Sequence, residues 1–301
     1  METQCQYVSS RGIMKSCDLY SSKPYSSTRY CTNLTIFSLS TNHPQIIYVC
    51  SSAIPHFYNT ILPNITDKFI LVSGDCDETI PNDLYNKMDV EGFLNHNMLI
   101  KWYCQNWIGS HAKVEIMPIG LNYHTMTYQN SVWGSKTSPL DQEKLLINII
   151  KKSQHFSKRQ IKCYANFHFA ISTRYGSDRT NAIKNIPTSL MFYEPVKINR
   201  LHTWLVQSKY AFVISPAGDG YDCYRTWEAL CLGCIPIIKK NAISKLFMEL
   251  PVLIVNDWTD VNEELLINTV HKFKDKQFNM DKLTLKYWTN LIKINAEAQS
   301  I

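Results

Sequence analysis

Short apolar runs rich in β-branched and aromatic residues recur along the chain, and polar stretches with helical spacing lie between them. Runs of this length and composition predict buried strands, and their alternation with helices predicts parallel sheets covered by helices. We therefore expect a fold of the α/β class. The predicted strands are 45–50, 68–73, 114–120, 161–167, 210–215, 235–239 and 252–255.

The predicted elements fall into two groups that separate near residue 150. The polar, irregular stretch "MTYQNSVWGSKTSP" (126–139) precedes "LDQEKLLINIIKKSQHF" (140–156), whose spacing predicts an amphipathic helix. A chain of 301 residues is long enough for two domains of ordinary size. We expect a first domain over 1–155, a second over 156–280, and a terminal helix within 281–301.

Helical spacing also predicts which side chains face inward. The expected inward residues are Leu145, Leu146, Ile149 and Ile150 in the middle helix, and Leu283, Tyr287, Leu291 and Ile294 in the last helix. The aromatic residues Trp102, Tyr103 and Trp107 fit a core better than a sugar-binding platform, although both roles use such side chains.

The formal net charge is +6 and the sequence pI is about 8.7, with much of the excess in the last third of the chain. No arginine-rich run accompanies it, so we expect a solvated basic face or a basic cleft for a phosphorylated small ligand, and no nucleic-acid partner. No apolar run is long enough to cross a bilayer, so no membrane span is expected.

The ten cysteines are scattered, and several lie in apolar runs such as "IIYVC" and "IKCYANF". The chain begins without the apolar segment of a signal peptide, so we expect free thiols in a reducing compartment, which means the cytoplasm. The pair in "CLGC" (231–234) has no second pair, so we expect neither a zinc site nor any other metal cofactor.

The segment 210–240 carries the strongest chemical signal. "YAFVIS" predicts a strand, "PAGDGYD" a loop, "CYRTWEALCLG" a helix with Trp227, Leu230 and Cys231 facing inward, and "IPII" a second strand. A helix N-terminus at the end of a strand is suited to a pyrophosphate, and Arg225 in the first turn can add a bidentate contact. Glu228 could accept the hydroxyls of a ribose. The alternative is a plain strand–loop–helix turn with a surface Arg–Glu pair.

The stretch "SPAGDGYDCYRTWEALCLGCIPI" (215–237) resembles the signature of the exostosin-like glycosyltransferases, most closely the soluble chlorovirus enzymes that build capsid N-glycans. Asp219 and Tyr224 stand where that signature usually has Asn and His. Weaker similarity extends to "GDCDETIP" (74–81), "PIGLNYHT" (118–125), "CYANFHF" (163–169) and "YGSDRTNAI" (175–183), so the resemblance covers most of the chain.

This resemblance implies a GT-B fold, in which two Rossmann-like domains face each other across a cleft and a final helix crosses back to the first domain. It also implies a donor site in the second domain and an acceptor site in the first. The donor-binding residues expected on this basis are Asn166, His168, Arg179, Ser215, Pro216, Gly218, Gly220, Tyr221, Asp222, Arg225, Thr226 and Glu228. Tyr123 and His124, which follow a predicted strand of the first domain, are the expected acceptor-binding residues.

Asp75 and Asp77 in "GDCD" (74–77) have the spelling of the D-x-D that binds a metal in single-domain glycosyltransferases. The predicted diphosphate loop lies far away in the other domain and needs no cation there. A carboxylate at a strand end facing the cleft could instead take a proton from an acceptor hydroxyl. We expect these residues to be catalytic, with Asp75 ahead of Asp77 as general base because it is nearer the strand. A turn without chemistry is the alternative.

Together these features predict an inverting, metal-independent glycosyltransferase. By resemblance to the family's β-xylosyltransferase, the expected donor is UDP-xylose and the expected acceptor is a hydroxyl of an oligosaccharide such as a viral capsid N-glycan. The rival hypothesis is a non-catalytic protein that binds sugar nucleotides or glycans on the same scaffold. Both would bind UDP, whereas only the enzyme would transfer the sugar.

Overall fold

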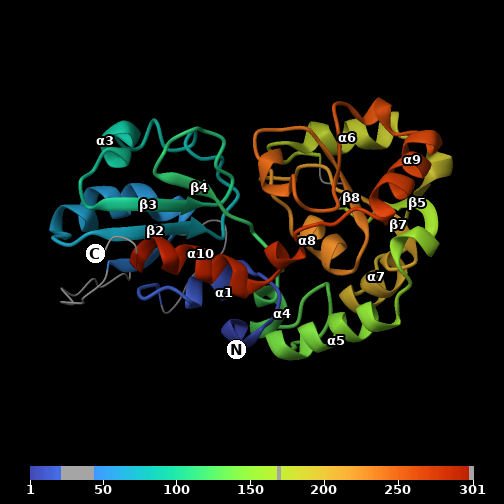
Figure 1. Cartoon of the computed structure of the whole chain (residues 1–301), viewed down its shortest axis with the longest axis horizontal. Helices are drawn as coiled ribbons and strands as arrows, with labels where there is room; N and C mark the ends of the chain where they lie inside the picture. Colours follow the sequence, from blue (N-terminus) through green and yellow to red (C-terminus); the bar gives the residue numbers. More distant parts are fainter. Residues whose placement is uncertain (22–43, 168–170, 298–301) are drawn as a thin grey trace.

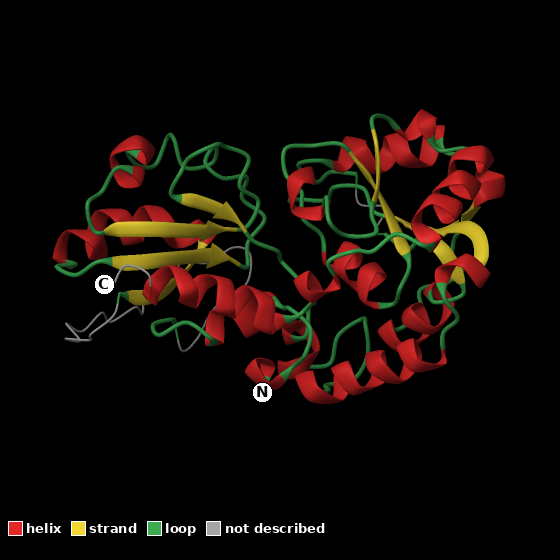
Figure 2. Cartoon of the chain, in the orientation of Figure 1, coloured by secondary structure: helices red, strands yellow, loops and turns green. Residues whose placement is uncertain are grey.

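The computed structural model describes residues 1–21, 44–167 and 171–297, which form two parallel sheets set side by side (Figure 1). The first sheet has the order β1-β2-β3-β4. Its strands are β1 (Gln45–Cys50), β2 (Phe69–Gly74), β3 (Leu99–Cys104) and β4 (Val114–Ile116). Figure 2 shows these strands pointing toward the second half, so their carboxyl ends lie between the halves.

The second sheet has the order β6-β5-β7-β8-β9, again with every pairing parallel. Its strands are β5 (Gln160–Tyr164), β6 (Met191–Phe192), β7 (Tyr210–Ile214), β8 (Ile235–Lys239) and β9 (Leu253–Val255). The central strand β7 is buried along its whole length. Loops that leave the carboxyl ends of such strands are the usual ligand-binding segments of open parallel sheets.

Helices cover both sheets (Figure 2). We call the part of the molecule around the first sheet the first half, and the part around the second sheet the second half. The first half and the segment that connects it to the second contain α1 (Ser10–Lys15), α2 (Ile54–His56), α3 (Val90–Leu94), α4 (His124–Tyr128) and α5 (Pro139–Lys152). The second half contains α6 (Gly176–Asn185), α7 (Arg200–Gln207), α8 (Tyr224–Cys231) and α9 (Glu263–Lys274), and α10 (Leu285–Glu297) follows. The connecting helix α5 packs against α7, and α10 packs against α1, β1 and β2.

All the strands expected from apolar runs are present; β1 and β8 have the predicted bounds, and the others have shifted ends. The run 114–120 forms strand only as far as Ile116, and its remaining residues continue as a loop. Two strands were not predicted. In β3, Lys101 interrupts the apolar run, yet Trp102 and Tyr103 are fully buried, as expected for core aromatics. The other, β6, is too short to leave a pattern in the sequence.

The inward faces of two helices differ from those predicted. In α5, Leu146 and Ile149 are buried but Leu145 is 39% exposed, because the buried face continues through the polar residues Gln142 and Glu143. The Glu143 carboxylate accepts hydrogen bonds from the backbone amides of residues 6 and 7, which explains a buried charge there. In α10, Ile294 is 61% exposed, and Trp288 and Ile292 are buried instead.

The predicted helix in 210–240 has the expected form. Trp227, Leu230 and Cys231 of α8 are buried, and Gly233 follows with φ of 71°. The Gly233 and Cys234 amides donate to carbonyls of the last turn, which is how a left-handed glycine ends a helix. Among the cysteines within strands, Cys104, Cys163 and Cys50 are buried.

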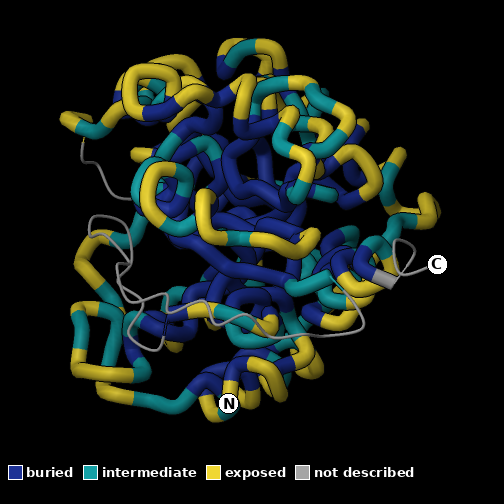
Figure 3. Tube along the Cα trace, turned by 90° about the vertical axis from the view of Figure 1, so that its left-hand side faces the viewer, coloured by how far each residue is buried: buried dark blue, intermediate teal, exposed yellow. Residues whose placement is uncertain are grey.

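One hydrophobic cluster runs through both halves of the molecule. It joins strand residues of the first sheet to Trp227, Phe247 and the inner face of α10, whereas a second cluster lies within the second half alone. Figure 3 shows the buried segments in the interior and exposed residues on the outer helices and loops. The shared cluster holds the two halves together on the side of α8 and α10.

The two parallel sheets with covering helices confirm the expected α/β class and the expected arrangement of two α/β units. The domain limits near 155 and 280 stay a prediction. Among the described residues, no helix combines the length and apolar character needed to cross a bilayer.

Docking of α10 onto the first sheet should depend on Trp288, which is 3% exposed and donates through Nε1 to the Lys282 carbonyl at 2.8 Å. We expect Trp288→Ala to lower the free energy of unfolding by about 3–5 kcal/mol because it leaves a cavity and an unpaired carbonyl. The matched control is Ile294→Ala on the exposed face of the same helix, which should cost no more than about 0.5 kcal/mol. Equal losses in denaturant melts of the two variants would contradict this docking.

Candidate functional site

The carboxyl end of β7 leads through the loop 215–223 into α8. Ser215 Oγ lies 2.7 Å from Thr226 Oγ1, and Arg225 Nη1 donates to the Pro216 carbonyl at 2.6 Å. These bonds tie the start of the loop to the first turn of the helix. Cys223, the N-cap residue of α8, makes no capping bond through its side chain. The helix N-terminus therefore presents its partial positive charge at the loop, as an anion site requires.

Two arginines approach this loop from different helices. Arg179 of α6 is 7% exposed, and a Cβ atom on Gly218 would lie 2.6 Å from its Nη2 atom. Burial lowers the pKa of Arg179, and the positive charge of Arg225 lowers it further. The nearby Asp219 and Asp77 carboxylates oppose this shift, so Arg179 lies among charges from both the loop and the first half of the molecule. Planar guanidinium groups bind phosphate oxygens in pairs.

Gly220 brings the loop against the first half of the molecule. A Cβ atom there would lie 2.8 Å from Asn106 Nδ2 and 3.4 Å from the Cα atom of Asp77. Only glycine fits this approach without displacing its neighbours. Asn106, which follows β3 with φ of 54°, also accepts the Asp222 amide through Oδ1 at 2.9 Å. The loop is thereby held beside the carboxyl ends of β2 and β3.

Both carboxylate oxygens of Asp222 accept hydrogen bonds, and these bonds help to hold the loop 215–223 against the first half of the molecule. Oδ2 accepts the Ile119 amide at 2.7 Å and Oδ1 accepts Trp227 Nε1 at 2.8 Å. Burial raises the pKa of Asp222 to about 7, and the donated hydrogen bonds oppose that shift. The side chain, 3% exposed, links a first-half loop to α8. Of the residues expected to bind the donor, Asp222 is thus engaged within the protein.

Asp75 and Asp77 lie in different surroundings. Asp75 is 2% exposed, and its φ is 62°. Its Oδ2 atom forms an ion pair with Arg11 Nη2 at 2.8 Å, and this contact does not have the geometry of a hydrogen bond. Burial raises its pKa to about 6, against the opposing charge of Arg11. Asp77 is half-buried, and burial and then Asp219 raise its pKa. The backbone of Asp77 lies against Gly220, which places this residue beside the loop 215–223.

Glu228 does not pair with Arg225, so the surface Arg–Glu pair considered from the sequence is not formed. Glu228 Oε1 lies 3.3 Å from Arg200 Nη2, with side chains 14% and 7% exposed. Arg200 also donates to the Asn122 carbonyl at 2.6 Å and to Gln142 at 2.9 Å. Burial raises the pKa of Glu228, and the Arg200 charge opposes it.

The two expected acceptor residues are both buried. Tyr123 is 1% exposed and donates through Oη to Glu143 at 2.9 Å, so its hydroxyl is already engaged. His124 is 7% exposed, and its ring centre lies 6.2 Å from that of Tyr224. Burial lowers the pKa of His124 to about 3, with Arg11 adding to the shift. A neutral imidazole is therefore expected near the start of α8.

The remaining donor candidates lie at the rim or beyond the described chain. The Asn166 amide is exposed and donates to Thr203 at 3.2 Å. Tyr221 stacks on Tyr175 with ring centres 4.3 Å apart. His168 lies outside the described residues. The structure thus brings Arg179, Ser215, Pro216, Gly218, Gly220, Arg225 and Thr226 together around one loop.

Several residues that shape the site were not found from the sequence. Arg11 and Arg200 each neutralise a carboxylate from a distant segment, and Asn106 supports the loop through an unusual backbone conformation. Pairings across such separations leave no periodic signal. Arg174 and Tyr175 stand beside or within "YGSDRTNAI", where only Arg179 was expected to act.

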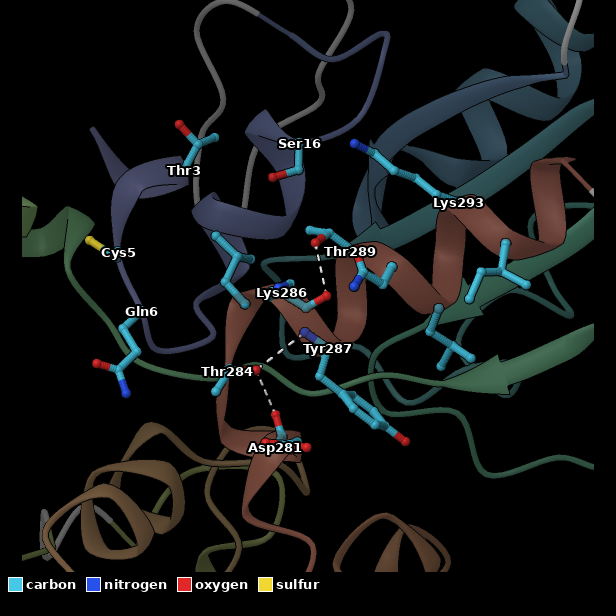
Figure 4. Close-up of a pocket in the computed structure, with 14 residues that line it drawn as sticks. Thr3, Cys5, Gln6, Ser16, Asp281, Thr284, Lys286, Tyr287, Thr289 and Lys293 are labelled. Carbon is cyan, nitrogen blue, oxygen red and sulfur yellow. Dashed lines mark hydrogen bonds between the residues drawn. The ribbon is translucent and has the colours of Figure 1, made fainter.

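A groove of about 1020 Å³ lies elsewhere, between the N-terminal segment and α10 (Figure 4). Its lining includes Thr3, Gln6, Asp281, Tyr287 and Lys293, and none of the predicted donor or acceptor residues. We therefore place the candidate site at the loop 215–223 and not at this groove. In the parts of the chain that the structure describes, no three His, Cys, Asp or Glu side chains cluster as metal ligands would.

No protein-family model matches the chain, and no curated protein matches it significantly. Among solved structures, an α1,3-fucosyltransferase with GDP-fucose shares 13% identity, covers 95% of each chain and gives a TM-score of 0.39. An E. coli trehalose-6-phosphate protein bound with UDP-2-fluoro glucose shares 8% identity over 85% of this chain and 71% of its own, with a TM-score of 0.36. Similarity this low carries no inference about activity, and the fold assignment rests on the two parallel sheets.

Proposed function

We propose that this chain is a nucleotide-sugar-dependent glycosyltransferase. The observation that carries the proposal is the convergence of Arg179 and Arg225 on the glycine-containing loop at the N-terminus of α8, with Asp77 against Gly220 of that loop. An anion site and a carboxylate are thereby adjacent, one from each half of the molecule. A sugar transfer needs both, because a diphosphate leaves as the acceptor hydroxyl loses its proton.

In this proposal the two guanidinium groups and the amides of the loop bind the donor diphosphate. Their charge stabilises the negative charge that develops on the leaving diphosphate, so no cation is needed for that step. Glu228, which pairs with Arg200 and whose side chain is 14% exposed, is the proposed acceptor of the ribose hydroxyls. Ser215 and Thr226 support the loop through their mutual hydrogen bond.

The difference in burial favours Asp77 as the general base, which reverses the order expected from position along the strand. A base must reach the acceptor hydroxyl, and Asp75 is 2% exposed and paired with Arg11. Asp77 is half-buried, and burial raises its pKa above the usual value of an aspartate, which makes it a stronger base. A carboxylate base acting opposite the leaving diphosphate would give inversion at the anomeric carbon.

The finer assignment follows the resemblance of "SPAGDGYDCYRTWEALCLGCIPI" to the exostosin-like enzymes. We propose UDP-xylose as donor and a glycan hydroxyl of the capsid N-glycan type as acceptor, with the reaction in the cytoplasm. Tyr123 and His124 would then shape the acceptor side from beneath, since both are buried. A non-catalytic sugar-nucleotide-binding protein would use the same anion site without turnover.

Arg225→Ala should weaken UDP binding by about 1.5–3 kcal/mol, the range for a hydrogen bond to a charged group. This corresponds to a rise in Kd of about 10- to 150-fold in calorimetric titrations. The matched control is Arg159→Ala, because Arg159 donates to the Leu232 carbonyl at the opposite end of α8. Unchanged UDP affinity in a folded Arg225→Ala protein would remove the donor site from this loop.

UDP-xylose should raise the melting temperature in the presence of excess EDTA, since a ligand that binds only the folded state stabilises it by mass action. We expect smaller shifts from UDP-glucose and GDP-fucose at the same concentration. A shift that appears only after Mn²⁺ or Mg²⁺ is added would show that the diphosphate needs a cation. A larger shift with GDP-fucose would replace the proposed donor.

Asp77→Asn should lower the rate of sugar transfer by about 10²- to 10⁴-fold, the usual contribution of a positioned base, and leave UDP affinity nearly intact. Asp75→Asn should act mainly on the free energy of unfolding, by about 3–5 kcal/mol, because it removes the negative charge that pairs with the buried Arg11 guanidinium. Transfer kinetics and thermal melts of both variants separate the roles. If Asp77→Asn keeps full turnover and a folded Asp75→Asn protein is inactive, then Asp75 is the general base and Asp77 is not.

A further inference from the structure

The dipeptide Arg174–Tyr175, immediately before α6, contacts one loop from each half of the molecule. Toward the first half, Tyr175 Oη lies 2.5 Å from Thr79 Oγ1, and Arg174 donates to the same hydroxyl at 3.3 Å and pairs with Asp83. These contacts reach the loop that begins at Asp77.

The same two residues also contact the loop 215–223, which we call the donor loop. The Arg174 amide donates to Asp219 Oδ1 at 3.1 Å, and the Tyr175 amide donates to the Gly218 carbonyl at 3.0 Å. The Tyr175 ring also stacks on Tyr221, with an interplanar angle of 24°. One short segment therefore fixes both the loop with the diphosphate site and the loop with the proposed base.

The geometry matters because transfer requires the acceptor oxygen to reach both the anomeric carbon and Asp77. Misplacing reacting groups by about 1 Å can cost roughly 100-fold in rate. Gly220 of the donor loop lies against Asp77, so sliding of either loop changes the spacing directly. Nothing in the described contacts of Arg174 or Tyr175 places them in the anion site itself.

We propose that Arg174 and Tyr175 are positioning residues that set the spacing between the donor loop and the Asp77 loop. This inference rests on the proposed function for its effect on catalysis. The coupling between the two loops does not depend on that function and can be measured without substrate.

The ion pair between Arg174 and Asp83 is partly open to solvent. The side chains of Arg174 and Asp83 are 42% and 27% exposed, so solvent and salt screen their attraction. The contacts of Asp222, by contrast, are buried. The dipeptide therefore sets the outer spacing of loops that a buried contact already joins, and its loss should affect rate far more than folding.

A double-mutant cycle with Arg174→Gln and Asp83→Asn tests the coupling. Asp83 also accepts the Thr79 amide at 2.8 Å, and Asn keeps an oxygen for that bond. We expect each single variant to lower kcat for transfer by about 10- to 100-fold with UDP affinity retained, and the double variant to lose no more than either single one. The control cycle uses Lys239→Gln and Asp257→Asn, an exposed ion pair of 3.0 Å within the second half, and should leave kcat unchanged.

Hydrogen exchange on the ligand-free proteins separates this inference from the proposed function. Arg174→Gln should speed exchange of amides in both 79–83 and 218–221, and the control variants should not. Faster exchange without any transferase activity in the wild-type chain would uphold the coupling and refute the function. Unchanged exchange, or additive losses of kcat in the cycle, would overturn the coupling even in an active enzyme.

Discussion

The buried carboxylate of Asp222 joins the two halves of this protein at the point where its chemistry is proposed to occur. It accepts one hydrogen bond from the backbone of a first-half loop and one from the indole of Trp227 on α8. Trp227 is fully buried in the cluster that both halves share. The N-terminus of α8 and the loop 215–223 that precedes it are therefore fixed relative to the first sheet as well as to the second. This buried contact therefore fixes the inner spacing between the donor loop and the first-half loops, inside the outer bridge that Arg174 and Tyr175 make.

The charges around the site divide into two kinds. Asp75 with Arg11, and Glu228 with Arg200, are ion pairs that cross between distant segments and are largely withdrawn from water. Burying one partner alone would be costly, so such pairs persist only when both are present. Arg179 and Arg225 are arranged differently, because both reach the loop 215–223, each from a different helix. The first kind supports the backbone, whereas the second places positive charge at the loop where the donor is proposed to bind.

The sequence predicted the parts of the fold that depend on neighbours along the chain. Apolar runs predicted the buried strands of both sheets, and "CYRTWEALCLG" predicted α8 together with its terminal glycine. It did not predict β3, because Lys101 interrupts the apolar run. The inward face of α5 was wrong at Leu145, since Gln142 and Glu143 are buried through hydrogen bonds that hydrophobic periodicity does not encode. The sequence also did not indicate that Tyr123, expected to bind the acceptor, donates its hydroxyl to Glu143.

The same limit explains why the candidate site was only partly predictable. Serine, glycine and arginine near one helix start form a local pattern, and the structure gathers those residues around one loop. The residues that decide how that loop meets the other half are separated from it by large stretches of chain, as Asn106 is from Asp222 and Thr79 from Tyr175. Contacts of that kind follow from how two sheets are packed, and the packing rests on the shared hydrophobic cluster and not on any short pattern. A functional site at the junction of two parallel sheets therefore has a half that local sequence specifies and a half that only the folded arrangement creates.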